Sequence, residues 1–171
     1  GEYDAIGARL YPHGDLAAPV LGFIGRDGFG LGGAELAFDE YLRGEDGWNI
    51  VQRDAHGAGG RNQRYSVDLP SKRAISGADV YLTLDVDVQT ILQNALKQTL
   101  ETFGANAVMG IVMEPASGRI LAMANEPTFD PNEASRYALG ERANLCAAHN
   151  YEPGSTFKLV AAAAALEEGV F

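Results

Sequence analysis

The most regular hydrophobic pattern in the 171-residue sequence lies between residues 85 and 104. Apolar side chains recur there every three or four residues, which is the spacing of one helical face. These positions are Val88, Ile91, Leu92, Ala95, Leu96, Leu100 and Phe103. Asp85 precedes them as a candidate N-cap, and Gly104 follows them as a suitable end. The pattern predicts an α-helix that buries this apolar face.

Shorter apolar runs predict strands. Residues 107–113 and 119–124 form two mostly apolar runs, the second beginning with Arg119. They flank the segment Glu114–Gly118, whose Pro, Ser and Gly favour a turn. This arrangement is typical of a β-hairpin. Further strand candidates are residues 19–24, 48–53 and 80–84.

The glycine-rich first part of the chain predicts loops and one short helix. Loops are expected at residues 25–33 and 56–63, where Gly and polar residues cluster. A short helix is expected over residues 35–42, ended by Gly44. Its expected inward side chains are Leu36, Tyr41 and Phe38.

Composition changes about residue 75, which divides the chain into two units. The first favours a small, mostly-β module, and the second has clearer helical and strand periods. Residues 125–150 are polar and contain two prolines, which predicts mostly loop, and a last helix is expected from Glu152 to about Gly169. The sequence therefore predicts an α+β protein with units at residues 1–75 and 76–171.

Composition and charge exclude several classes of protein. The chain is 46% hydrophobic and 21% charged, which is an ordinary globular balance. Its formal charge of −10 argues against nucleic acid as a partner, because such proteins need a basic face. A single cysteine, Cys146, makes an internal disulfide impossible, and the three histidines lack metal-ligand spacing, so no metal site is expected. No stretch approaches the roughly 20 apolar residues of a membrane span.

The strongest chemical signal is the pair Ser155 and Lys158. On a helix, residues three apart share a face and come within hydrogen-bond reach. A serine hydroxyl needs a base to become a nucleophile, and a lysine can be that base when burial lowers its pKa. The apolar residues 159–166 predict a buried helix, whose first N–H groups could stabilise an oxyanion at Ser155. The alternative is that Ser155 is a plain N-cap and Lys158 a solvated surface residue.

The segment Tyr151-Glu-Pro-Gly-Ser-Thr-Phe-Lys158 resembles the active-site serine motif of class B penicillin-binding proteins, the peptidoglycan transpeptidases of bacterial division and elongation. Four further blocks resemble the family in the same order: Arg9–Gly14 with Val20–Phe23, Gly30–Gly47, Leu82–Gln89, and Glu114–Met123 with Pro127–Asn132. The resemblance implies a pedestal-like or dimerisation-like module at residues 1–75. It also implies the first part of a β-lactamase/transpeptidase-like domain at residues 76–171.

The resemblance implies an acyl-serine reaction. Ser155 would attack the D-Ala-D-Ala end of a peptidoglycan stem peptide, with its own backbone N–H in the oxyanion hole and Lys158 as general base. A second stem peptide would resolve the ester as a cross-link, with no metal or cofactor. β-Lactams would be inhibitors, and a membrane glycosyltransferase or divisome protein would be a partner. The location would be the extracytoplasmic face of the bacterial cell membrane.

Several features of that family are absent from the sequence. It contains neither Ser-x-Asn nor Lys-Thr/Ser-Gly, and neither a membrane anchor nor the family's first Arg-Gly-rich motif. Leu145 stands where the family often has arginine, and Pro19 where it often has histidine. We therefore expect both ends to be cut from a longer chain and this chain alone to be inactive. The hairpin is then expected to expose an unpaired edge that favours aggregation.

Two other functions remain open at this point. A serine β-lactamase or β-lactam sensor can share Ser-Thr-Phe-Lys, although simple β-lactamases lack the pedestal-like blocks, and its faster deacylation would distinguish it. A non-catalytic divisome interaction module is the second alternative. Partner binding that survives Ser155→Ala would favour that module.

Weaker signals have simpler interpretations. Residues Gly28–Gly33 match the dinucleotide pattern G-x-G-x-x-G, but the following helix is short and no third strand-helix unit follows, so a loop with positive φ is favoured. Cys146 is expected to be a small buried residue. Arg9 and Glu35 are expected to form an ion pair between the units.

Overall fold

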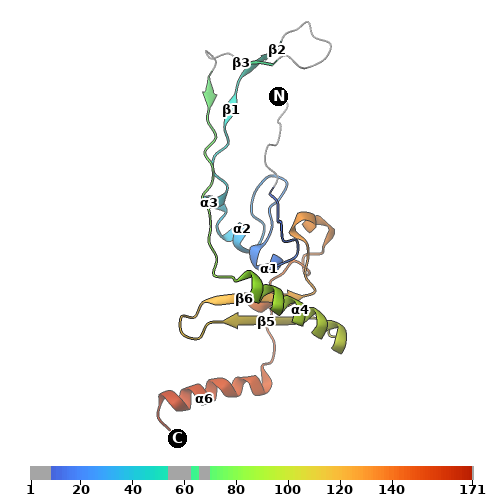
Figure 1. Ribbon diagram of the computed structural model, residues 1–171, viewed down its shortest axis with the longest axis vertical. Coiled ribbons are helices and arrows are strands. Elements are labelled where there is room, and N and C mark those ends of the chain that lie inside the picture. Colours follow the sequence, from blue (N-terminus) through green and yellow to red (C-terminus); the bar gives the residue numbers. More distant parts are fainter. Residues whose placement is uncertain (1–8, 54–62, 66–69, 171) are drawn as a thin grey trace.

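The computed structural model describes residues 9–53, 63–65 and 70–170. It shows an α+β chain, as the sequence predicts (Figure 1). A long helix crosses a β-hairpin in the body, short strands form a narrow arm, and the last helix lies apart from the body. No helix in these ranges is both long and apolar enough to cross a membrane.

The long helix is α4 (Val86–Phe103), and both of its predicted ends are confirmed. The carboxylate of Asp85 accepts hydrogen bonds from two backbone N–H groups of the first turn. Gly104 ends the helix with a φ of 57°, a left-handed conformation that glycine adopts without strain. The two caps hold the helix to the length that the sequence predicts.

The buried side of α4 is rotated from the predicted apolar face. Gln89 and Gln93 are buried, whereas Ile91 and Phe103 are exposed. The predicted buried face was therefore wrong for Ile91 and Phe103. The side chains of Gln89 and Gln93 form hydrogen bonds with backbone groups of neighbouring segments, so they lie on the buried side of the helix. The need of these buried amides for hydrogen-bond partners, and not the positions of the apolar side chains alone, therefore sets the orientation of the helix.

The predicted hairpin is confirmed as antiparallel strands β5 (Val108–Met113) and β6 (Ile120–Glu126). Helix α4 packs on this hairpin, and a Cβ at Gly110 would lie 2.9 Å from a methyl carbon of Leu92. A glycine at this position therefore allows the close approach of helix and sheet. Gly118 completes the turn with a φ of 74°.

The strand predicted at residues 19–24 is wrong. Residues Ala18–Leu21 instead form the short helix α1, with Pro19 in its first turn, where the missing proline N–H costs no hydrogen bond. Only Ile24 has a strand-like pairing, a single bridge to Gly30. Glycines at both ends of the loop that follows allow this tight return of the chain.

The short helix predicted over residues 35–42 is broken into α2 (Gly33–Ala37) and α3 (Asp39–Leu42). Its predicted orientation was wrong, because Leu36 and Tyr41 are exposed while Glu35 is buried. The carboxylate of Glu35 has polar partners on the inner side, which turn α2 so that its apolar residues face solvent.

The arm is a ribbon of four short strands: β1 (Trp48–Asn49), β2 (Val51–Arg53), β3 (Gln63–Tyr65) and β4 (Ser71–Lys72). Strand β1 pairs with β4, and β2 pairs with β3, both antiparallel. The strand predicted at residues 48–53 is confirmed, with an interruption at Ile50. The loop predicted at residues 56–63 lies outside the described residues except for its last position.

Residues 80–84 are not a strand, which contradicts the prediction. The hydroxyl of Thr83 donates to the carbonyl of Ile120, and the N–H of Asp85 donates to the carbonyl of Leu121. Two contacts with the start of β6 are too few for a ladder. The apolar run therefore serves as an extended lead into α4.

The compact hydrophobic core contains residues from the first part of the chain and from the loop after β6. Ala18 and Phe23 from the first part pack with Phe129 and Ala134 from the loop after β6. Phe129 makes edge contacts with Phe23 at 5.7 Å and with Tyr137 at 6.1 Å between ring centroids. The core therefore spans residues on both sides of the expected unit boundary, which itself stays a prediction.

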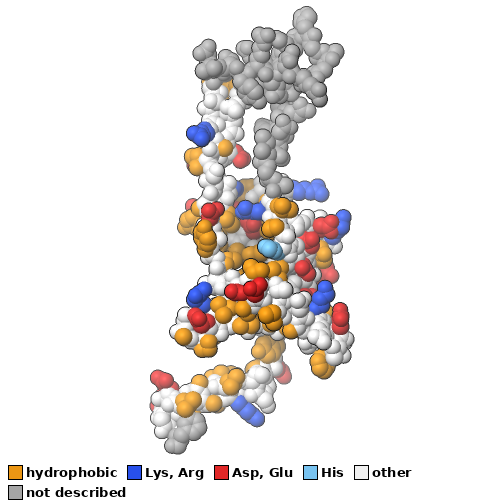
Figure 2. Space-filling view, in the orientation of Figure 1, with side chains coloured by type: hydrophobic (Ala, Val, Ile, Leu, Met, Phe, Trp, Pro, Cys, Tyr) orange, Lys and Arg blue, Asp and Glu red, His pale blue; other side chains and the backbone are white. Residues whose placement is uncertain are grey.

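The last quarter of the chain is mostly loop, as predicted, before the final helix. The loop contains two short helical turns, η1 (Pro131–Arg136) and α5 (Leu145–Ala148). The final helix begins as η2 (Gly154–Phe157) and continues as α6 (Lys158–Glu167). The prediction that this helix is buried was wrong, because α6 extends away from the body with its apolar side chains exposed (Figure 2).

Candidate active site

The backbone of η2 holds Ser155 and Lys158 one turn apart. Gly154 enters the turn with a φ of 53°, and the backbone N–H of Lys158 donates to the carbonyl of Ser155. In a 3₁₀ turn, residues three apart lie nearly above one another. The turn therefore presents both side chains on the same side of the chain, as the sequence spacing predicts.

Both side chains are exposed, which corrects the expectation of a buried lysine. Helix α6 carries no charge between Lys158 and Glu167, but in the described chain no element packs around it apart from η2. Water therefore solvates the ammonium group.

The segment before the serine is anchored to the hairpin. The backbone N–H of Leu145 donates to Oδ1 of the buried Asn125 at 3.1 Å. The Sγ of Cys146 lies 3.3 Å from the carbonyl oxygen of Ala124 and 3.6 Å from that of Gly110. Cys146 is only partly buried, and this burial raises the pKa of its thiol.

Three buried polar atoms in this region have no hydrogen-bond partner among the described residues. They are Thr128 Oγ1, Arg142 Nε and Asn144 Oδ1. Buried polar atoms are nearly always paired in folded proteins. The loop between β6 and Ser155 therefore contains buried polar atoms that form no hydrogen bond with the described residues.

Two buried glutamines connect the site-bearing hairpin to the first part of the chain. Gln89 bonds both backbone groups of Met123, donating to its carbonyl at 3.1 Å and accepting from its N–H at 2.9 Å. Gln93 accepts from the N–H of Ala17 and donates to the carbonyl of Asp15, each at 3.2 Å. Helix α4 thus bonds β6 on one side and the first segment on the other.

A second polar cluster lies in the first segment. Arg9 and Glu35 form the predicted ion pair, with Nε and Oε1 2.8 Å apart, although both belong to the first unit. The hydroxyl of Tyr11 donates to the same carboxylate at 3.3 Å. Burial, followed by the negative charge of Glu35, raises the pKa of Tyr11 to about 12. Asn132 joins the cluster to the later loop by bonding the backbone of Tyr11 twice.

The weaker sequence signals lie in a glycine-rich loop and at exposed histidines. The pattern Gly28–Gly33 forms a tight loop with positive φ at both end glycines, followed by a five-residue helix, which fits the simpler interpretation. His13 and His149 are exposed. Among the residues that the structure describes, no group of three His, Cys, Asp or Glu side chains could hold a metal.

Sequence reasoning missed the buried polar residues that position the site. Asn125 ends an apolar run, and Gln89 and Gln93 lie four apart within an amphipathic helix. An uncharged amide within an apolar run or beside an apolar face is a signal of internal hydrogen bonding. The sequence alone does not show which backbone group it meets.

Comparisons with known proteins identify the family of the chain. A serine and a lysine three residues apart at the start of a helix define the Ser-x-x-Lys class of acyl-serine proteins. A family model described as the penicillin binding protein transpeptidase domain matches residues 108–171, and one described as the penicillin-binding protein dimerisation domain matches residues 2–82. The chain belongs to the class B penicillin-binding proteins.

Individual relatives are similar over nearly all of the chain. The "probable peptidoglycan D,D-transpeptidase PenA" of Neisseria meningitidis serogroup A is 39% identical over 94% of the chain. The "penicillin-binding protein PbpB" of Mycobacterium tuberculosis is 37% identical over 99%. A crystal structure of penicillin-binding protein 3 from the same organism, complexed with aztreonam, matches 95% of the chain with 36% identity and a TM-score of 0.74.

The chain spans only part of these proteins. It covers 27% of PenA, 25% of PbpB and 32% of the crystallised chain.

Proposed function

We propose that this chain carries the nucleophile of a peptidoglycan D,D-transpeptidase. The Oγ of Ser155 attacks the carbonyl carbon of the penultimate D-alanine in a stem peptide. The peptide bond breaks, D-alanine leaves with the serine proton, and an acyl ester forms on Ser155. An amine of a second stem peptide then attacks the ester, which releases Ser155 and forms the cross-link.

One observation carries the proposal: the η2 turn presents Ser155 and Lys158 on one side, within the match to the transpeptidase family model. The name of PenA states the reaction of one relative, and the aztreonam complex shows a β-lactam bound to another. Together these support a serine that accepts both stem peptides and β-lactams.

The roles proposed for the two residues follow from their chemistry. Lys158 takes the proton from Ser155 as general base, and the N–H of Ser155 donates to the oxyanion. The exposed ammonium of Lys158 must lose its water for this step. We therefore propose that the 171-residue chain alone is not a competent enzyme and that further groups complete the site.

Location and partners belong to the same proposal. A peptidoglycan substrate places the protein at the extracytoplasmic face of the bacterial cell membrane. A membrane glycosyltransferase or divisome protein is the proposed partner, since a cross-linking enzyme acts on strands that a polymerase supplies.

The test uses the complete product of the gene that encodes residues 1–171, treated with a fluorescent penicillin. Mass spectrometry of the digest should place the acyl group on Ser155, and Ser155→Ala should abolish the label. Ser117→Ala, at an exposed serine of the hairpin turn, is the matched control and should label normally. Label on any other residue would contradict the proposal.

The same reagent tests the competence of the shorter chain. The 171-residue chain should label far more slowly than the complete product, because one oxyanion donor alone is worth about 10²–10³ in rate. Labelling at the same rate would show that residues 1–171 contain the whole acylation machinery. Rapid loss of label from the complete product would instead favour a β-lactamase.

A further inference from the structure

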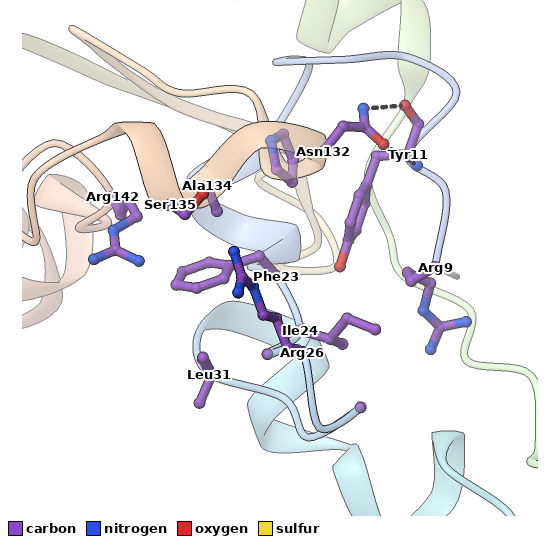
Figure 3. A pocket seen from close by; sticks show the side chains of 13 residues that line it. Arg9, Tyr11, Phe23, Ile24, Arg26, Leu31, Asn132, Ala134, Ser135 and Arg142 are labelled. Carbon is purple, nitrogen blue, oxygen red and sulfur yellow. Dashed lines mark hydrogen bonds between the residues drawn. The ribbon is translucent and has the colours of Figure 1, made fainter. Parts of the chain in front are cut away.

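An open cleft of about 570 Å³ lies between the first segment and the loop after β6. Its walls are the turn at residues 23–31 on one side and η1 with Arg142 on the other (Figure 3). No residue beyond Arg142 lines it, so the cleft is distinct from Ser155 and Lys158. Its volume falls within the usual range of ligand sites.

The cleft is positively charged in an acidic protein. Among the described residues, Arg9, Arg26 and Arg142 line it, and no described aspartate or glutamate does. Arg9 is neutralised by Glu35. Arg26 and Arg142 have no ion pair among the described residues, so they give the cleft a net positive charge while the chain as a whole carries −10.

The side chain of Arg142 is held in place, but one of its hydrogen-bond donors has no partner among the described residues. Its guanidinium lies over the ring of Phe23, 4.9 Å from the centroid, and its Nε is buried without a partner in the described part of the chain. In Figure 3 it lies on one side of Phe23, with Arg9 and Tyr11 on the other. A guanidinium fixed on an aromatic ring loses less freedom when it binds an anion.

The other residues that line the cleft favour one kind of anion over another. Phe23, Leu31 and Pro131 supply apolar surface beside the arginines. The N–H groups of Gly25, Gly28 and Leu31 already bond to carbonyls within the turn, so they form no cradle for a phosphate. Arginine forks match the two oxygens of a carboxylate, and the apolar surface suits a neighbouring hydrophobic side chain.

From this geometry we infer that the cleft binds an acidic peptide segment. Its carboxylate pairs with Arg26 and Arg142, and an adjacent apolar side chain packs on Phe23 and Leu31. The peptide belongs to a partner protein, and its binding does not depend on acylation of Ser155. The site therefore gives the protein a second point of recognition.

The test follows the arginine side chains by NMR in the ¹⁵N-labelled complete product of the gene that encodes residues 1–171. The probe is N-acetyl-leucyl-glutamate, and its uncharged counterpart is N-acetyl-leucyl-glutamine amide. The Nε–Hε signals of Arg26 and Arg142 should shift with the charged probe and not with the amide. Arg26→Gln should weaken binding about tenfold, the loss expected for one charge-assisted contact.

Arg119→Gln is the matched control, because Arg119 is exposed on the hairpin and lies outside the cleft. It should bind the probe as well as the unsubstituted chain does. Equal loss in this variant, or no shift at Arg26 and Arg142, would overturn the inference. Inorganic phosphate that competes as well as the dipeptide would also overturn it, by showing a non-selective anion site. Arg26 is exposed, so Arg26→Gln should leave the fold intact and the loss of binding can be assigned to the missing charge.

Discussion

Gln89 is a buried side chain whose two amide atoms each bond one backbone group of the same residue, Met123. The side chain is 1% exposed, so water cannot replace either bond. Replacing it with leucine would leave a buried N–H and a buried carbonyl unpaired. A buried polar group without a partner costs about 1–3 kcal/mol.

We therefore expect Gln89→Leu to lower the free energy of unfolding by about 3 kcal/mol, measured by urea denaturation. Gln98→Leu changes an exposed glutamine of the same helix and should stay within about 0.5 kcal/mol of the unsubstituted protein. Similar losses in the two variants would show that the bonds to Met123 are not what stabilises the contact between α4 and β6.

Glu126 gives the protein a predictable response to pH. Burial, reinforced by the negative charge of Asp15, raises the pKa of its carboxyl, while Lys97 opposes this. The folded protein therefore holds this proton to higher pH than the unfolded chain does. The cost of ionisation is absent below the unfolded pKa of about 4.3 and grows as pH rises through the folded pKa.

Glu126→Gln should accordingly stabilise the protein at pH 7 and change little at pH 4, measured as the difference in unfolding free energy. Glu101→Gln, at an exposed position of α4, should show no such pH-dependent gain. A larger gain at pH 4 than at pH 7 would contradict the direction of the shift.

At the residue scale, the sequence predicted interactions between residues that lie within one helical turn of each other. Asp85 caps its own helix, and Ser155 and Lys158 share one turn, so short spacing was sufficient. The burial of Glu35 and the exposure of Lys158 depend on which distant segments pack nearby, and spacing carries no such information. The errors therefore fall on long-range contacts.

Among the elements, α1 and α2 depend on glycines that allow close backbone contact. A Cβ on Gly22 would lie 1.8 Å from the carbonyl oxygen of Gly32, and its φ is 78°. Gly28 has a similar φ of 82°, but a Cβ there would meet nothing within 4 Å. Both positions have a positive φ, but Gly22 combines it with a ψ of −156°, a conformation almost confined to glycine, and it also lacks space for a side chain.

Gly28→Ala should cost about 1 kcal/mol, the strain of a left-handed residue. Gly22→Ala should cost at least about 2 kcal/mol more, because the two short helices must separate. Urea unfolding of both variants measures the difference. Equal costs would show that the contact between Gly22 and Gly32 relaxes freely.

Element length explains which predictions held. Helix α4 has 18 residues and the strands of the hairpin have six and seven, so their periods are readable. Helices α1 and α3 have four residues each, which is too short for a period to emerge. The apolar run at residues 80–84 looks like a strand, but in the described chain the two hydrogen bonds that Thr83 and Asp85 make with the start of β6 are too few for a ladder.

At the scale of the whole molecule, the chain exposes much apolar surface. On α6, Leu159 and Leu166 are 75% and 69% exposed, and Ile111 and Met113 on β5 are about half exposed. Apolar surface of this kind on a soluble chain favours association. We expect the 171-residue chain to self-associate as its concentration rises, measured by sedimentation velocity.

Replacing Leu159 and Leu166 together by lysine should reduce this association. Adding lysines at Asn94 and Gln98, two exposed polar positions of α4, changes the net charge equally and should reduce it less. A chain that stays monomeric and unfolds cooperatively without any substitution would contradict the expectation of an incomplete domain.

The core that joins Phe23 to Phe129 also sets the order in which the chain can fold. More than a hundred residues separate the two rings, so the first segment cannot bury its aromatic side chain until the later loop has been made. At typical rates of synthesis, roughly 5–20 residues per second, that delay is about 5–20 s. Closing such a long loop before any contact forms also slows the folding step itself. During this interval the ring of Phe23 stays exposed to water, so the first segment is open to contacts with other apolar surfaces until residue 129 has been made.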